Sequence, residues 1–418
     1  MVLLHLNEMS ADSSQVYVDG HERPDVVEYR QKVFLPRWRE FKRRMVVFDE
    51  DGHWRAPATL RPGEKLLVLV THDESTFNAN DGKRRLWIAG DKQPLRPKSR
   101  GKGIMVSGFL TPGGVLRVPD NIPDSELLAN PMWPLHPTSK LRCPKPVREA
   151  LEYLEYGKSN YWTSEKMVEQ TLRAAVPIFR YAFPGCQALW AFDNASNHCC
   201  FSTDALVAHK MNRNPGGEQP LMRDGFWHGG GRPQPMVFGD NHPQVMLRGE
   251  AKGIEQVLRE RKLWRKRRED GNLFLLQCPT TNNRPGCDPS MEGGCCARTV
   301  LAAEKDFREQ KGKLQEELEA LHQEVIFYPK FHCQLNFIER FWCAAKYYAR
   351  ENCLYTLEGL RETIPTALAS VTVGSINRYY NHCVRIMDAY EGGSIYGTAK
   401  FKEAVYKGHR QVVDKDKW

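Results

Sequence analysis

The order of apolar and polar positions predicts a sheet whose strands are separated by helices. Residues 65–75 contain an unbroken apolar run, which is typical of a central strand covered on both faces. Two further strands are expected at 86–90 and 103–110, and residues 119–161 lack a sustained period and are expected to form a surface excursion. A polar start followed by an apolar stripe predicts a helix at 163–183. The pattern favours the α/β class.

A second group of apolar segments completes this pattern. Residues 186–193 form an apolar run that ends in a carboxylate. Residues 325–342 predict a short buried strand, a proline-marked turn and then a helix with a carboxylate in its first turn. Two more helices are expected at 357–371 and 375–391, because each segment keeps helical spacing and a Gly-Gly pair follows the second.

Breakers and charge divide the chain into expected domains. Residues 1–60 are polar and basic, with a helix that is expected to end at Pro36. The main domain is expected at 61–390, interrupted by an insertion at 212–320 that is rich in Gly and Pro breakers. Residues 391–418 are expected to form a basic tail without a core pattern.

Composition and charge narrow the class of protein. The chain is 41% hydrophobic, an ordinary share for a globular protein. No run approaches the about 18 apolar residues that span a bilayer, and the N-terminus lacks the layout of a signal peptide. We therefore expect an intracellular protein with no membrane partner. The net charge of +9 favours a polyanionic partner, although many basic proteins bind no nucleic acid.

Three carboxylates lie at positions that such a fold can bring close together. Asp73 and Asp193 each follow an apolar strand, and Glu339 lies in the first turn of a helix. Active sites of open sheets commonly lie beyond the carboxyl ends of strands. Oxygen is the ligand that Mg²⁺ and Mn²⁺ prefer, and two ions about 3.5–4 Å apart can assist a displacement at phosphorus. Each acid also has a structural alternative: a turn for Asp73, a helix cap for Asp193, and a capping box for Glu339.

The insertion holds two further candidate sites. Its basic run is interpreted as a DNA-backbone contact or a nuclear-localisation signal, or else as the solvated face of a helix. Four of the twelve cysteines follow it, and they can complete a tetrahedral zinc site, with free thiols as the alternative. The candidate DNA contacts here are Arg259, Arg261, Lys262, Arg265, Lys266, Arg267 and Arg268, and the candidate zinc ligands are Cys278, Cys287, Cys295 and Cys296.

Three motifs resemble those of a known family. They are Thr71-His-Asp-Glu-Ser-Thr76, Phe192-Asp-Asn-Ala-Ser-Asn-His198 and Tyr328-Pro-Lys-Phe-His-Cys-Gln-Leu-Asn-Phe-Ile-Glu-Arg-Phe-Trp342. Over residues 60–390 the chain resembles the DDE superfamily endonucleases, the catalytic core of mariner-type transposases in its fungal form. The third motif is the most specific, because it has the family's proline followed by Leu-Asn-x-Ile-Glu-x-x-Trp.

The resemblance implies a fold and an activity. The implied fold is ribonuclease H-like: a mixed five-stranded sheet with flanking helices and a long insertion before the last catalytic helix. Asp73, Asp193 and Glu339 are implied as catalytic ligands of two Mg²⁺ or Mn²⁺ ions that cleave, and can rejoin, DNA phosphodiesters in the nucleus. Glu74 is the substitute ligand that the sequence offers beside Asp73. Candidate DNA contacts outside the insertion are His198 and Lys346, and Asn194 can orient a carboxylate or form a turn.

Two features depart from the family pattern. The second and third acids are usually a few tens of residues apart, whereas here the separation is 339 − 193 = 146. In the family such insertions can hold DNA or mediate assembly. A second copy of the chain is therefore a candidate partner, in a homo-oligomer. The family's N-terminal DNA-binding helices are not evident, so recognition of transposon ends is left open. The alternative function is a catalytically inactive, DNA-binding descendant of a transposase.

Overall fold

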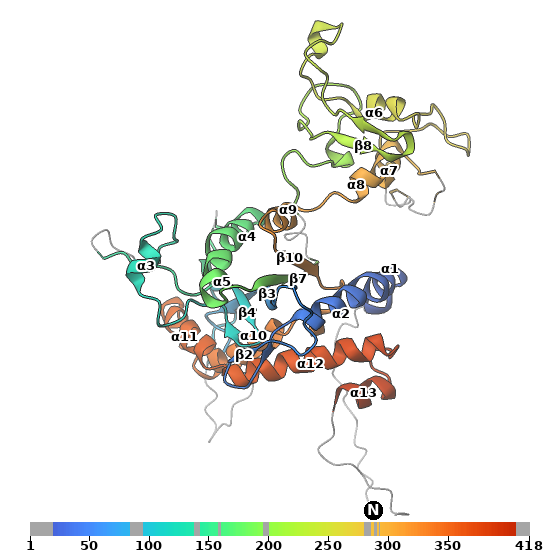
Figure 1. Cartoon of the computed structure of the whole chain (residues 1–418). Coiled ribbons are helices and arrows are strands. Elements are labelled where there is room, and N and C mark those ends of the chain that lie inside the picture. The colour runs from blue at the N-terminus through green and yellow to red at the C-terminus, as the bar shows by residue number, and fades with distance from the viewer. Residues whose placement is uncertain are drawn as a thin grey trace, which may run out of the picture. The chain divides into compact units, whose positions relative to one another are not determined.

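A computed structural model gives the fold (Figure 1). The chain forms two compact units, which we call unit 1, Met1–Ala195 with His322–Trp418, and unit 2, Ser196–Leu321. Unit 2 thus begins 16 residues before the expected insertion. The strand expected at 86–90 lies outside the described residues. The structure describes residues 20–83, 95–137, 143–157, 160–194, 200–279, 286–287, 291 and 293–406.

The centre of unit 1 is a mixed sheet with the strand order β10-β7-β3-β4-β5, in which β6 also pairs with β4. Strands β7 and β10 run parallel to β3, whereas β4 runs antiparallel to it and to β5 and β6. The expected α/β, ribonuclease H-like sheet is confirmed, with one short strand more than the five expected. The strands are β3 (Leu67–Asn78), β4 (Gly103–Thr111), β5 (Gly114–Val115), β6 (Leu151–Glu155), β7 (Gln187–Phe192) and β10 (Glu324–Phe327).

Strand β6 corrects the expected surface excursion at 119–161. It is an edge strand of five residues, of which only Leu154 is buried. A strand that short carries too little alternation to be recognised from its sequence. The same region also contains the short helix α3 (Asp124–Leu128).

Helices cover both faces of the sheet (Figure 1). On one face, Phe179 of α5 packs against Trp190 of β7, with ring centroids 6.0 Å apart. On the other face, the odd-numbered Leu67 and Leu69 of β3 join a core cluster that includes residues of the C-terminal helices. The helices are α4 (Ser164–Gln170) and α5 (Val176–Ala182) on the first face, and α10 (Ile338–Glu351), α11 (Leu357–Ala369) and α12 (Val373–Glu391) on the second.

The two ends of the chain pack into this same core. Helix α1 (Pro24–Tyr29) continues through a π-helical segment at 30–34 into α2 (Leu35–Arg44), which corrects the helix end expected at Pro36. Its Trp38 is buried, as is Phe401 of α13 (Ala399–Val405), so part of the tail at 391–418 does have a core pattern. A small hairpin, β1 (Val47–Phe48) with β2 (Trp54–Arg55), follows α2.

Unit 2 consists of short elements around a small core. The buried core cluster of its described part has fourteen apolar residues, among them Ile254, Leu258 and Leu301. The elements are β8 (Gly225–Trp227), β9 (Arg232–Gln234), α6 (Ile254–Glu260), α7 (Ala297–Ala303), α8 (Lys305–Arg308) and α9 (Lys313–Ala320). Among all described helices of the chain, none is both long and apolar enough to cross a membrane.

Candidate functional site

The first two acids lie on neighbouring parallel strands at the same height. The ladder between β3 and β7 runs from Leu67 opposite Gln187 to Thr71 opposite Ala191. Two residues further along this register, Asp73 falls opposite Asp193. Neighbouring strands are about 4.8 Å apart, so the two carboxylates arise from adjacent points of the backbone.

The surroundings of these two acids differ from expectation in one respect. Asp73 lies inside β3 rather than after its end, because β3 continues to Asn78 along β4. Asp193 does follow its strand directly, since β7 ends at Phe192. The parallel ladder therefore stops just where the acids stand, and one side of β3 is left open at Asp73.

The third acid, Glu339, is held beside them by the N-terminus of α10. Asn336, three residues earlier, is buried, accepts a hydrogen bond from the Thr71 hydroxyl at 2.6 Å and donates one to the His72 carbonyl at 3.2 Å. These bonds tie the start of α10 to β3. The capping alternative is not realised, because no side chain caps α10 and the Glu339 carboxylate makes no hydrogen bond or ion pair among the described residues.

Trp342 is a site residue that the sequence pattern alone does not reveal, although it belongs to the third motif. It lies one helical turn after Glu339, and its indole N–H donates a hydrogen bond to Asp73 Oδ2 at 3.1 Å. Gly108 of β4, which pairs with Asp73, lies under the ring: a Cβ atom there would be 3.2 Å from Trp342 and 2.8 Å from Leu151. The glycine therefore lets the indole reach across the sheet to the carboxylate.

Electrostatics indicate that the three carboxylates are close and lack sufficient countercharge. Burial raises the pKa of Asp73 well above its usual value, and repulsion by Glu339, Glu74 and Asp193 adds to the rise. Burial and repulsion by Asp193 also raise the pKa of Glu339, while Lys346 opposes this rise. A group of partly buried acids that repel one another is what a divalent cation would stabilise.

The ligand atoms of the three acids are too widely spaced for all of them to bind one ion as they stand. Oxygen ligands of a single Mg²⁺ lie about 2.1 Å from it, so they are at most about 4.2 Å from one another. The ligand atoms of Asp73, Asp193 and Glu339, all described residues, do not all lie within 4.8 Å of one another. Two ions about 3.5–4 Å apart can share a more widely spaced set of carboxylates than one ion can. The three residues offer the carboxylate oxygens that such ions take as ligands.

The neighbours of these acids have structural roles. Glu74 accepts a hydrogen bond from the Trp162 indole and faces the other side of β3, so it does not join the three acids. Asn194 donates to the Tyr328 carbonyl at 2.7 Å, a long-range contact that ties the end of β7 to the end of β10. His198 lies outside the described residues. Lys346 lies two turns after Glu339 on α10, with its ammonium 5.7 Å from the centre of the Phe77 ring.

A second group with the composition of a metal site lies in unit 1. It consists of Asp49, Asp51 and His53, whose ligand atoms all lie within 4.8 Å of one another. All three are exposed, and Asp49 accepts hydrogen bonds from the backbone N–H groups of the other two. This is the ordinary geometry of an aspartate-stabilised turn.

The basic run of unit 2 is mostly not helical, because α6 ends at Glu260. Arg261 must be removed from the candidate DNA contacts. Its side chain is 0% exposed and forms ion pairs with Asp306 at 2.6 Å and Glu304 at 3.2 Å, so it is a structural residue of unit 2. A buried arginine paired in this way cannot reach a phosphate without unfolding its surroundings.

The remaining basic residues differ in whether their charged groups already have partners within unit 2. Arg259 and Arg268 form ion pairs with Glu255 and Asp270. Arg265 donates to two backbone carbonyls. Exposed side chains without an ion pair among the described residues belong to Lys262, Lys266 and Arg267.

Comparison with known proteins gave structural neighbours only. No family model and no curated protein matches the chain. The Mos1 transposase paired-end complex with left transposon end is 10% identical over 92% of this chain and 67% of its own, with a TM-score of 0.41. The Mos1 mariner paired end complex with Mn has the same identity and TM-score over 91% and 66%. A pre-cleavage Mos1 transpososome is 11% identical over 95% and 67%, with a TM-score of 0.37.

Proposed function

We propose that the protein is a metal-dependent DNA endonuclease with a transposase-like core. The observation that carries the proposal is the gathering of Asp73, Asp193 and Glu339 by three separate elements, β3, the end of β7 and the start of α10. Glu339 does not cap its helix, and Asp73 is oriented by Trp342 from that same helix. The basic charge of the chain, +9, suits a polyanionic substrate.

In this proposal Asp73 and Asp193 would hold the metal ions from two neighbouring strands, and Glu339 would complete the ligand set from the helix. The ions would activate the attacking oxygen and neutralise the leaving oxygen of a phosphodiester. Trp342 fixes the orientation of Asp73 through its indole N–H, and Asn336 fixes the helix on which Glu339 stands. Both are positioning residues. We also propose a nuclear location, where the proposed substrate would be met, and a fluorescent fusion of the whole chain would test it.

The direct test is nicking of supercoiled plasmid by the purified chain with Mg²⁺ or Mn²⁺. Asp193→Asn keeps the shape of the side chain and removes a charged ligand, so nicking is expected to fall more than about 100-fold, beyond the loss typical of a residue that only supports a ligand. Glu74→Gln is the matched control, because Glu74 is adjacent to the site but turned away from it. Its activity is expected to stay within a factor of about two.

Two outcomes would contradict the proposal. Equal nicking by the wild-type protein and Asp193→Asn would show that the activity does not come from this site. A wild-type protein that binds the plasmid but does not nick it would instead support the alternative of an inactive DNA-binding descendant. Circular dichroism and melting temperature of each variant would show that the fold is intact.

A further inference from the structure

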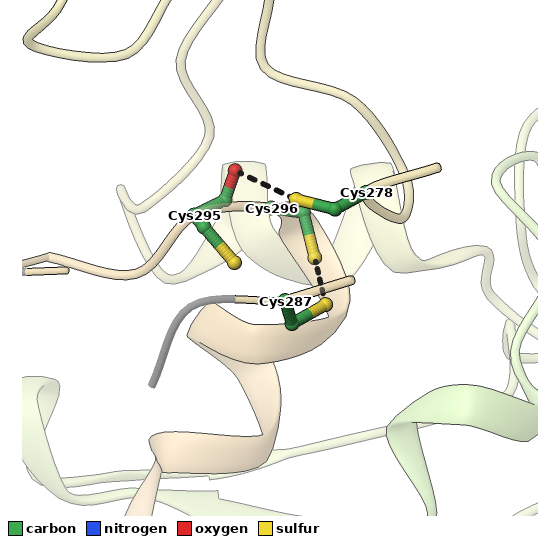
Figure 2. A group of neighbouring side chains, drawn as sticks. All are labelled: Cys278, Cys287, Cys295 and Cys296. Atoms are coloured by element: carbon green, nitrogen blue, oxygen red, sulfur yellow. Dashed lines mark hydrogen bonds between the residues drawn. The ribbon is translucent and has the colours of Figure 1, made fainter. Parts of the chain in front are cut away.

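Unit 2 brings four cysteines together at one point (Figure 2). Cys278 and Cys287 lie outside helices and strands, and Cys295 and Cys296 lie directly before α7. The four sulfurs all lie within 4.8 Å of one another. None is in a disulfide, so the structure gathers four free thiols.

The spacing of the sulfurs fits a single tetrahedral ion. A zinc–sulfur bond is about 2.3 Å long, so two ligands of one ion are at most about 4.6 Å apart and ideally about 3.8 Å apart. The Sγ atoms of Cys287 and Cys296 are 3.6 Å apart, which is near the tetrahedral value and far beyond the about 2.05 Å of a disulfide. Four thiolates around one point are a ligand set that Zn²⁺ prefers.

The site is also built into its surroundings. Cys295 and Cys296 are only 2% and 0% exposed. The Thr299 hydroxyl lies 3.1 Å from the sulfur of Cys296 and 3.4 Å from that of Cys295, where it can donate to a thiolate. Hydroxyl and amide donors of this kind orient metal ligands and tune their charge.

A metal here would add to the stability that the small apolar core of unit 2 provides. Unit 2 spans residues 196–321, but the core cluster of its described part joins fourteen apolar residues and its helices are short. Small cores are commonly supplemented by a metal or by disulfides. Two of those fourteen residues, Ala297 and Leu301, lie on α7 directly after the cysteine pair, so a metal would fix the start of α7 against the core.

A metal bound by the four cysteines would also fix the basic run of unit 2, residues 259–268, which we call the basic segment. Arg265 donates to the carbonyls of Gly293 and Gly294, both at 2.6 Å, and Arg268 donates to the carbonyl of Cys295 at 3.5 Å. Gly293 and Gly294 have φ angles of 69° and 79°, a turn that leads the chain into the cysteine pair. The position of the basic segment therefore depends on the backbone beside the sulfurs.

We propose that Cys278, Cys287, Cys295 and Cys296 bind one structural Zn²⁺ that folds unit 2 and fixes the basic segment beside it. All four ligand positions are then taken by thiolates, so the ion has no open position for a substrate. The proposal is independent of the carboxylate site in unit 1.

The test is the metal content of the full chain, purified without added chelator. Elemental analysis is expected to find about one zinc per chain, and a mercurial reagent is expected to release it as the thiols react. After exchange, Co²⁺ is expected to show the intense d–d bands and the thiolate charge-transfer absorption of a tetrahedral sulfur site. Zinc-free wild-type protein, a Cys287–Cys296 disulfide, or an octahedral Co²⁺ spectrum would each overturn the proposal.

Variants locate the ion. Cys296→Ser is expected to lose the zinc, whereas Cys143→Ser, an exposed cysteine of unit 1, is expected to keep it. Asp193→Asn is also expected to keep it, so failure of the zinc proposal can be told from failure of the proposed endonuclease. Zinc retained in full by Cys296→Ser would contradict the assignment. If Cys296→Ser does not fold, the zinc content and Co²⁺ spectrum of the wild-type protein still decide.

Discussion

Trp342 joins the helix of Glu339 to the strand of Asp73 through one hydrogen bond, from its indole N–H to the Asp73 carboxylate. Replacing it by Phe removes the N–H donor but keeps an aromatic ring over Gly108. Removing a hydrogen bond to a metal-binding carboxylate typically lowers metal affinity about 10–100-fold. We therefore expect Trp342→Phe to raise the Mn²⁺ concentration for half-maximal nicking at least about 10-fold, with a smaller change at saturating Mn²⁺.

The matched control for this variant is Trp190→Phe. Trp190 is also buried in the sheet of unit 1, but its indole N–H has no hydrogen-bond partner among the described residues. The same substitution there is expected to leave the Mn²⁺ dependence unchanged. An equal Mn²⁺ dependence for Trp342→Phe and wild type would mean that the indole does not orient Asp73.

His332 provides a pH-dependent prediction at the same scale. Its Nε2 accepts a hydrogen bond from the buried Arg30 guanidinium at 2.8 Å, so the ring must be neutral, and burial lowers its pKa to about 4. His21 stacks on its ring, and Glu22 pairs with Arg30. The unfolded histidine has a pKa of about 6.5, so the unfolded state binds the extra proton between these values, and stability falls as the pH falls from 6.5 towards 4.

This linkage is measurable. Between pH 7 and pH 5 the free energy of unfolding is expected to fall by about 2 kcal/mol through His332 alone. Urea unfolding at each pH, with amide exchange in β3 as an independent measure, would show the decrease in the wild-type protein. The decrease is expected to be smaller in His332→Gln, which retains an acceptor for Arg30. The same decrease in both proteins would contradict the assignment.

The sequence could predict the three acids as candidates, because each follows an apolar segment or opens a helix. It could not predict which other residues complete the site. The hydrogen bond between Trp342 and Asp73 joins positions 269 residues apart, and the need for Gly108 arises only when a ring lies over it. Arg261 shows the opposite case, since a basic run suggests a surface while its partners, Asp306 and Glu304, lie some forty residues away.

At the scale of elements, two prolines show why a helix end was misplaced. Pro36 and Pro177 are each the second residue of an α-helix that follows a π-helical segment, at 30–34 and at 171–175. In each case the residue before the proline donates to the carbonyl five positions earlier, from Leu35 to Arg30 and from Val176 to Thr171. The wider π turn shifts the carbonyls that a proline ring would otherwise meet. The helix therefore continues through the proline.

The basic segment of unit 2 gives the prediction at this scale. If it binds DNA, the exposed Lys262, Lys266 and Arg267, which form no ion pair among the described residues, are the ones that reach phosphates. Removing one cation from a phosphate lowers the magnitude of the slope of log affinity against log salt by about 0.9, so the triple alanine variant is expected to lower it by about 2.7. Fluorescence anisotropy with a DNA duplex over a range of salt concentrations would measure the slope.

A single alanine variant provides the comparison. Arg259 is exposed in the same segment but is bonded to Glu255 at 2.6 Å, so Arg259→Ala is expected to change the slope little. A triple variant with the wild-type slope would remove this segment from the DNA interface. That result would not bear on the assignment of the three carboxylates in unit 1.

At the scale of the whole molecule, the candidate site is completed within unit 1. Strands β7 and β10 are neighbours, although the chain between Phe192 and Glu324 includes all of unit 2. The sequence predicts an interruption from its Gly and Pro breakers, and therefore places its start at residue 212, just before those breakers begin. In the structure Leu206, Val207 and Met211, which precede residue 212, belong to the core of unit 2.

The central claim is that Asp73, Asp193 and Glu339 together hold divalent metal. The most direct test is anomalous X-ray diffraction from a crystal of the protein soaked in Mn²⁺. We expect Mn²⁺ peaks between Asp73 and Asp193 with Glu339 beside them, within about 2.0–2.2 Å of carboxylate oxygens, and their disappearance in Asp193→Asn. A Mn²⁺ peak only at the exposed Asp49 turn, or no peak at the three acids, would contradict the claim.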